Sequence, residues 1–366
     1  MATVTKSIGT SSRDYSTIAL WEADLDESSI YSSGDTAVGE CYNDTTFSIS
    51  GSTDIDGGST IGLDNRILTA AAGERHDGTA NSGVRLLCTN TGGDIEFLLM
   101  RGPGSSSAGG QVEWLEIDCN EKKMRAAVRI YTHQGIQNCL VHGARWTGSF
   151  NETVAIKSRS KQTWVCNNIV YDINGNNGSS NGWGTRGISI AQNDWEACVN
   201  NTVYGVITNS SAGLTFAYGI EVTSGGQYQR IYNNIAMGTA SDNGTATDFV
   251  TQTSTSYTDA NYSSDTSAPG NTNYRSESAA DTFVSIDTDS EDFHLKAGAN
   301  AIGEGRDAGT SEIIAGKTMP YPPNTWNVDI DGRDRDAEGD TWDIGADQFV
   351  ASAAAQTGKS FLLFMD

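Results

Sequence analysis

Acidic side chains are the residues of this sequence that are numerous enough to support chemistry. The 366 residues include 46 Asp and Glu against 23 Lys and Arg. Two carboxyl groups at a suitable separation can cleave a glycosidic bond, and two or three on neighbouring turns of a repetitive fold can bind calcium. The sequence does not pair the candidates, and we expect each to be a solvent-facing acid of a strand or loop. They are Glu113, Glu116, Asp172, Glu196 and Glu221.

A second group of acids lies near the C-terminus and invites a calcium interpretation, because hard cations take oxygen ligands. The segment "DRDAEG" (334–339) matches only the start of a calcium loop, and Gly345 stands where a bidentate acid is needed. Arg333 and Arg335 can instead pair with the acids. We therefore expect a solvated acidic surface, with calcium as the one candidate cofactor and no assigned metal site. The acids are Asp329, Asp331, Asp334, Asp336, Glu338, Asp340 and Asp343.

Histidines and tryptophans give weaker signals. The four histidines share no metal-ligand spacing, so no zinc site is predicted. Trp146 and Trp183 fall in segments that we predict to be variable loops, where an aromatic face could stack on a sugar. No catalytic residue is predicted, and these two tryptophans are the candidate glycan contacts. The histidines are His76, His133, His142 and His294.

A short motif recurs through the middle of the chain as "VCNNIVY" (165–171), "VNNTVY" (199–204) and "YNNIAM" (232–237). Its second Asn gives Asn168, Asn201 and Asn234, which are 33 residues apart twice, and Asn138 in "IQNCLV" is interpreted as an earlier copy 30 residues before. A fixed period indicates a repeat architecture. Because Asn tolerates left-handed backbone geometry, we predict that these four residues stack along one edge and form a hydrogen-bonded ladder.

Alternating apolar segments precede the copies at 128–130, 154–156, 188–190 and 220–222. Alternation with a period of two predicts strands. One coil then contains a first strand ("GISIA"), a second strand ("EACV"), a tight Asn-Asn bend, a third strand ("TVYGV") and a variable loop. This order predicts an all-β chain folded as a parallel β-helix with three strands per coil. The outward column of the first strand is predicted to be Arg129, Ala155, Ser189 and Glu221.

The ends of such a helix need caps, because an open coil exposes unpaired backbone groups. Ile18, Trp21 and Leu25 follow helical spacing after Ser16 or Thr17, which predicts a short capping helix. We divide the chain into the N-terminal cap and first strands (1–80), regular coils (81–255), an irregular region that closes the C-terminal end (256–350), and a linker with an apolar tail (351–366).

The apolar tail follows small residues and needs a cover, since large apolar side chains lose burial energy in water. It can fold over its own last coil or dock on a neighbouring subunit, and we favour docking. The candidate docking residues are Phe361, Leu362, Leu363 and Phe364.

With its "NNIVY" and "NNTVY" motifs followed by Gly-led strands, the chain resembles the right-handed parallel β-helix proteins of the pectate-lyase-like superfamily. The segments "SSDTSAPG" (263–270), "DFHLKAGANAIGEG" (292–305) and 328–349, together with "RDYSTIALWEADL", resemble β-helix proteins of secreted bacterial polypeptides and of phage or metagenomic structural proteins. Asp334, Asp336 and Gln348 depart from that pattern.

The resemblance also implies what an enzyme of this superfamily would show. A pectate-lyase-like enzyme would carry an Arg or Lys base beside bound calcium. A polygalacturonase-like hydrolase would carry four motifs, of which only the fragments "VHGAR" (141–145) and "AIKS" (155–158) are present.

Charge and composition restrict the partners. A formal charge of −23 repels phosphate backbones, so nucleic acid is not an expected partner. The start of the chain has no signal-peptide pattern and no stretch has 18 consecutive apolar residues, so no membrane partner is expected. The cysteines occur singly and are predicted to be reduced core residues. They are Cys41, Cys88, Cys119, Cys139, Cys166 and Cys198.

These observations predict a non-catalytic structural protein of a phage virion, either a capsid decoration or a spike or fibre subunit, in contact with host glycans. Other virion proteins and copies of the same chain are the expected partners, with a trimer as the analogy-based oligomer. Synthesis in the host cytoplasm and a place on the virion follow from this prediction. The alternatives are a polysaccharide lyase or glycoside hydrolase, and an extracellular adhesion module.

Overall fold

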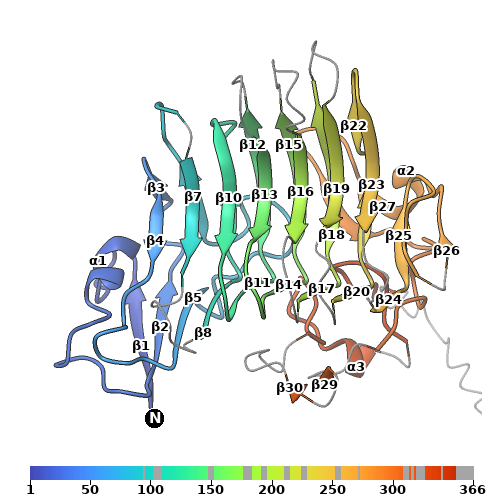
Figure 1. The fold of residues 1–366 in the computed structure, drawn as a ribbon. Helices are drawn as coiled ribbons and strands as arrows, with labels where there is room; N and C mark the ends of the chain where they lie inside the picture. The colour runs from blue at the N-terminus through green and yellow to red at the C-terminus, as the bar shows by residue number, and fades with distance from the viewer. Residues whose placement is uncertain are drawn as a thin grey trace, which may run out of the picture.

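The computed structural model describes residues 1–93, 95–101, 109–146, 152–175, 184–190, 196–209, 215–223, 229–251, 257–270, 273–307, 313–314, 317–318, 326–338 and 341–351. Its strands form three long parallel sheets, which we name A, B and C, and the chain visits them in that order once per coil. This confirms a parallel β-helix with three strands per coil (Figure 1).

Sheet A has nine strands. They are β1 (Thr3–Ile8), β2 (Thr36–Cys41), β5 (Asn65–Ala70), β8 (Gly109–Glu113), β11 (Gln134–Gln137), β14 (Trp164–Cys166), β17 (Ala197–Val199), β20 (Arg230–Tyr232) and β24 (Tyr257–Asp259).

Sheet B has ten strands, nine on its main path and a tenth, β22 (Ala240–Ser241), that pairs with β18 beside that path. The nine are β3 (Phe47–Ile49), β6 (Arg85–Cys88), β9 (Glu116–Asp118), β12 (Leu140–Trp146), β15 (Ile169–Gly175), β18 (Thr202–Thr208), β21 (Ile235–Met237), β25 (Asn261–Ser263) and β26 (Asn273–Tyr274).

Sheet C has seven strands. They are β4 (Thr53–Ile55), β7 (Ile95–Met100), β10 (Met124–Ile130), β13 (Thr153–Ser158), β16 (Thr185–Ile190), β19 (Phe216–Val222) and β23 (Thr245–Thr251).

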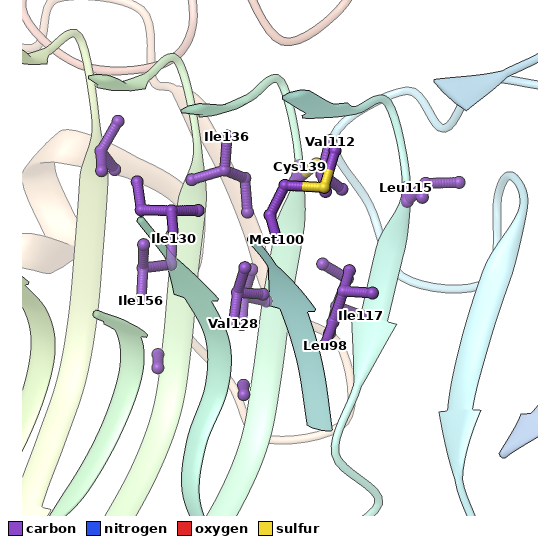
Figure 2. Close-up of a cluster of buried hydrophobic side chains, with 14 of the residues drawn as sticks. Leu98, Met100, Val112, Leu115, Ile117, Val128, Ile130, Ile136, Cys139 and Ile156 are labelled. Carbon is purple, nitrogen blue, oxygen red and sulfur yellow. The ribbon is translucent and has the colours of Figure 1, made fainter. Parts of the chain in front are cut away.

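The interior of the coils is one continuous apolar core. Figure 2 shows side chains of all three sheets meeting there, among them Val112 and Ile136 from sheet A, Ile117 from sheet B, and Leu98 and Val128 from sheet C. Alternate residues of each strand point inward, so every coil adds a layer that its neighbours cover. All six cysteines are buried and free of disulfides, as predicted.

The coils begin near the start of the chain. β1 pairs in parallel with β2, so parallel pairing already begins near residue 3, within the segment 1–80 assigned to the cap and first strands. The predicted capping helix is present as α1 (Ile18–Ala23), and its N-cap Thr17 accepts a hydrogen bond from the Leu20 N–H at 3.2 Å. Within this helix, the side chains of Ile18 and Trp21 are buried. Among the described residues we find no helix with the length and hydrophobicity of a membrane span.

Two columns of residues form the corner between sheets A and B, where the predicted ladder is found with one correction. Asn168, Asn201 and Asn234 stack in one column, in which Asn168 donates its side-chain amide to Asn201 Oδ1 and Asn201 donates to Asn234 Oδ1. The column continues to Asn261, which the sequence analysis missed. Asn138 lies outside it, because the strand register places Cys139 opposite Asn168.

Asn138 belongs to the second column, whose members have left-handed backbone geometry. Its φ is 49°, and Asn167, Asn200 and Asn233 follow with 54°, 56° and 53°. Asn is among the few residues that adopt this geometry at low cost. The motif Asn-Asn therefore serves two functions, since the first Asn turns the chain and the second bonds along the axis.

The C-terminal region first adds strands to the end of the helix and then folds back along its side. β24, β25 and β26 first add the last strands of sheets A and B. The antiparallel pair β27 (Phe283–Ser285) and β28 (Asp292–Leu295) then packs on the outer face of sheet B, where Phe293 contacts the rings of Tyr171 and Tyr204. Short helix α2 (Ala279–Thr282) precedes this pair.

The following segments cover sheet A and the corner. Trp326 and Trp342 pack on Trp164, Val199 and Tyr232 of the outer face of sheet A. At the corner, the side-chain amides of the second Asn column donate to backbone carbonyls of the C-terminal region, and Asn200 reaches Trp326 O at 3.0 Å. Figure 1 shows this red region below the coils, with α3 (Arg335–Glu338) and the pair β29 (Ile313–Ile314) and β30 (Lys317–Thr318).

Candidate functional site

Sheet C carries the face on which the coils differ most. In the middle coils, from β8 to β21, each A–B connection is two residues long, as at 167–168 and 200–201, whereas the B–C connections from β9 to β19 run from five residues (119–123) to nine (176–184). The C-terminal region contacts the coils on sheets A and B and at their corner, and the described residues show no comparable cover over sheet C. Hydrogen bonds between parallel strands hold the side chains of this face in register from coil to coil.

The outward column of sheet C corrects one predicted position. Arg129 pairs in register with Lys157, Lys157 with Ser189, and Ser189 with Glu221. Ala155, which the sequence placed in this column, belongs to the interior core. Segment 154–156 was aligned two residues out of register, because Val154, Ala155 and Ile156 are all buried and hide the alternation.

Four basic and three acidic side chains form a chain of ion pairs along this face, which we call the sheet C charge ladder. Glu152 contacts Arg186 at 3.0 Å and Arg159 at 3.1 Å, and it also pairs with Lys157. Glu221 pairs with Arg186 and accepts from the Ser189 hydroxyl at 2.9 Å. The ladder comprises Glu96, Arg129, Glu152, Lys157, Arg159, Arg186 and Glu221, with Glu96 paired to Arg129.

Lys157 has the most perturbed charge of the ladder. Burial lowers its pKa to about 7, and the guanidinium groups of Arg159, Arg129 and Arg186 act in the same direction. Its ion pair with Glu152 opposes this shift. Burial and the same neighbouring cations also lower the pKa of Arg159. Positive charge is thus concentrated here in a chain that carries twice as many acids as bases.

The ladder can attract an anionic polymer along the axis of the helix. Its bases outnumber its acids, and Arg159 keeps 43% of its side chain exposed. Guanidinium groups bind carboxylate and sulfate or phosphate oxygens in a forked geometry. Lys157 is only 4% exposed, so the outer cations are the ones that a polymer reaches first.

A histidine and two acids meet on sheet B. His142 Nε2 lies 3.0 Å from Glu116 Oε1, and Asp118 is close enough for a shared ion. Arg85 pairs with both acids, and Glu116 also accepts from the Asn81 N–H at 2.7 Å. A cation is therefore already supplied by the protein, and this cluster stabilises the packing of sheet B.

The predicted acid candidates are less exposed than expected. Glu116, Glu196 and Glu221 are buried, and burial raises the pKa of Glu113, which accepts from Gln137. Asp172 pairs with Arg145 at 2.9 Å beside a cavity of about 640 Å³ between sheet B and residues 288–292. Their positions on different faces do not bring two of them together as a catalytic pair.

Two of the C-terminal acids are buried structural acceptors, whereas Asp334 and Asp336 are exposed, so the expected solvated acidic surface is found only in part. Asp329 and Asp343 are buried and accept backbone N–H groups, such as that of Phe349 at 2.6 Å from Asp343. The fully buried Arg335 donates to the carbonyls of Gly345 and Ala346. Burial raises the pKa of both acids and lowers that of Arg335.

Sequence analysis missed a second histidine cluster, because its members are far apart along the chain. His294 lies between Asp292, at 2.5 Å from Nδ1, and Asp331, at 2.9 Å from Nε2, with Asp347 adjacent. Burial opposes its positive charge, but the hydrogen bond with Asp331 and the nearby carboxylates raise the pKa of His294 to about 10. Burial raises the pKa of Asp347 to about 6.

The aromatic candidates do not form a glycan site among the described residues. Trp146 ends strand β12 and is 2% exposed, with the Lys123 ammonium 4.5 Å from its ring centroid. The ring therefore has no exposed face on which a sugar could stack. Trp146 lies in a strand, which corrects the predicted loop position. Trp183 and the tail residues 361–364 lie outside the described residues.

Comparison with known proteins adds little to this picture. No protein-family description matches the chain, and no curated protein matches it in sequence. Among solved structures, the chain is similar to the crystal structure of pectate lyase Pel9A, with 14% sequence identity, a TM-score of 0.35, and coverage of 88% of this chain and 96% of that chain. The fold assignment therefore rests on the strand pairing of the three sheets.

Proposed function

We propose that the chain is a non-catalytic, rod-like structural protein of a phage particle that contacts anionic host glycans along the sheet C charge ladder. The supporting observation is that the C-terminal region covers sheets A and B and leaves the basic residues of sheet C between variable connections. The C-terminal region packs along the coils and would stiffen a rod-like protein. The excess of bases over acids favours an acidic glycan.

Charge reversal tests the glycan contact. Arg159→Glu should weaken binding to an immobilised uronate-containing polysaccharide about tenfold or more, equivalent to about 1.4 kcal/mol. Lys296→Glu makes the same charge change on the exposed surface of the C-terminal region and should leave binding unchanged. Equal effects of the two variants, or equal binding to neutral dextran, would reject a role for sheet C.

Lys157 favours one second candidate, a polysaccharide lyase. With a pKa of about 7, its amine would take the C5 proton of a uronate while a guanidinium neutralises the carboxylate, the C4–O bond breaks, and the departing sugar oxygen takes a proton from water. Incubation with uronate polymers tests this by the absorbance of the unsaturated product. Turnover that disappears in Lys157→Gln would establish the lyase and overturn the non-catalytic proposal.

The place on a particle needs its own test. Mass spectrometry of density-purified particles from a culture that carries the gene should detect the chain in a fixed ratio to the capsid protein. The proposed docking tail, 361–364, is tested by deletion of 360–366. Loss of particle attachment by a chain with unchanged melting temperature supports docking, whereas a lowered melting temperature with attachment retained supports self-capping. Light scattering tests the trimer.

A further inference from the structure

Three side chains from separate segments converge beside the coils. His294 comes from β28, and Asp331 and Asp347 come from two segments that follow it in the chain. Their ligand atoms all lie within 4.8 Å of one another. They line a cavity of about 520 Å³ together with Asp77, Arg333 and Phe349, among others.

One carboxylate oxygen of Asp347 has no hydrogen-bond donor among the described residues. Asp347 is 3% exposed, and its Oδ2 accepts from the Leu295 N–H at 2.7 Å. Its Oδ1 is buried and makes no hydrogen bond in the described structure. A buried carboxylate oxygen without a donor is costly. The Glu116–Asp118–His142 cluster differs, because Arg85 pairs with both of its acids.

We propose that His294, Asp331 and Asp347 bind a divalent first-row transition-metal ion such as Zn²⁺ or Mn²⁺. One imidazole nitrogen with carboxylate oxygens suits these ions. Calcium prefers oxygen ligands, so the imidazole nitrogen does not favour calcium at this site. The site is independent of the glycan contact proposed for sheet C.

The surroundings of His294 match a metal-bound histidine. Its Nδ1 contacts the Asp292 carboxylate, which leaves Nε2 to face Asp331 and the cavity. Such a carboxylate–histidine pair orients imidazole ligands in metal sites. Arg333 holds the other oxygen of Asp331 at 3.0 Å.

The distance between His294 and Asp331 needs only a small adjustment. His294 Nε2 and Asp331 Oδ1 are 2.9 Å apart, and ligands of a tetrahedral ion with bonds of about 2.1 Å are about 3.4 Å apart. The ion would replace the proton shared by these two atoms, which would separate by about 0.5 Å. Water from the cavity can complete the coordination, and the ion would tie β28 to residues 331 and 347.

Calorimetric titration of the full chain, first stripped with a chelator, tests the proposal with ZnCl₂, MnCl₂ and CaCl₂. We expect one Zn²⁺ or Mn²⁺ per chain and much weaker Ca²⁺ binding. Asp347→Asn retains an acceptor for the Leu295 N–H and should reduce affinity at least tenfold. Asp292→Asn, which removes the orienting carboxylate, should cost about 10–100-fold.

His142→Gln is the matched control in the other histidine cluster and should leave affinity unchanged. The absorption bands of bound Co²⁺ should shift in His294→Gln, and circular dichroism should show that each metal-free variant is folded. No binding of Zn²⁺ or Mn²⁺, binding that survives both Asp347→Asn and His294→Gln, or binding lost in His142→Gln would overturn the proposal.

Discussion

Asn168 directs two donors to a single atom of Asn201, one coil further along the axis. Its backbone N–H lies 3.1 Å and its side-chain Nδ2 lies 3.0 Å from Asn201 Oδ1. Asn201 repeats the arrangement on Asn234, and Asn234 on Asn261. The buried backbone at this corner therefore depends on side-chain carbonyls for its hydrogen bonds.

Asn201→Ala should lower the free energy of unfolding by about 3 kcal/mol, because it removes the acceptor of the buried Asn168 backbone N–H and the amide that donates to the Asn234 side chain and to Val165 O. Urea denaturation measures the change. Asn209→Ala is the control, since Asn209 donates to Asn174 on the partly exposed side of the coils and should cost less than about 1 kcal/mol. Equal losses in the two variants would contradict the importance of the ladder.

Gly135→Ala should disrupt the coils near β11. A Cβ at this position would lie 1.9 Å from Nε1 of the buried Trp164, and the ring has no room to move away. Overpacking of this kind costs about 3 kcal/mol or more. Gly51→Ala has no atom within 4 Å of the new Cβ and should change the melting temperature little. A Gly135→Ala variant as stable as the Gly51→Ala control would contradict the close contact between residue 135 and the Trp164 ring.

Trp326→Ala should loosen the C-terminal region without unfolding the coils. Its ring is fully buried against sheet A, and loss of such a side chain costs about 3–5 kcal/mol. Hydrogen exchange should increase for residues 326–338 and 341–351, and strands β11, β14 and β17 should stay protected. Uniform deprotection of coils and C-terminal region would mean that they unfold as one unit.

His76 should make the fold sensitive to acid. Its Nε2–H donates to the Asn138 carbonyl at 3.0 Å and its Nδ1 accepts from the Gly78 N–H at 3.2 Å. The neutral ring satisfies both hydrogen bonds, whereas a proton on Nδ1 would face the Gly78 N–H. Burial lowers its pKa to about 4, below the ordinary value of 6.5 for a histidine.

The unfolded chain therefore binds a proton between pH 6.5 and 4 that the folded chain excludes, and stability falls by up to about 3 kcal/mol as the pH drops through this window. Urea denaturation at several pH values checks this. His76→Gln should have a smaller pH dependence by that amount, because other titrating groups are common to both proteins. Identical slopes for the two proteins would exclude His76 as the cause.

Local sequence patterns were sufficient for the coil. The 33-residue spacing, the Asn-Asn bends and the alternation of period two predicted three strands per coil, and helical spacing after Thr17 predicted α1. These features depend on residues close together in the chain and on backbone preferences. Where one of these patterns is weak, the predicted strand register is wrong. Asn138 stands alone and fits either column until its φ of 49° decides, and three buried residues concealed the shift from Ala155 to Lys157.

Tertiary structure alone decided where the C-terminal region lies and which charges meet. The Asn138 amide bonds to Asp329 O across 191 residues, and His294 meets Asp331 and Asp347 only because β28 and the last segments pack side by side. Composition predicted solvated acids, but Asp329 and Asp343 are buried, where they accept from the backbone N–H groups of Gln348 and Gly303, respectively. Contacts of this length follow from how the completed coils present their outer faces, and no periodic signal in the sequence records them.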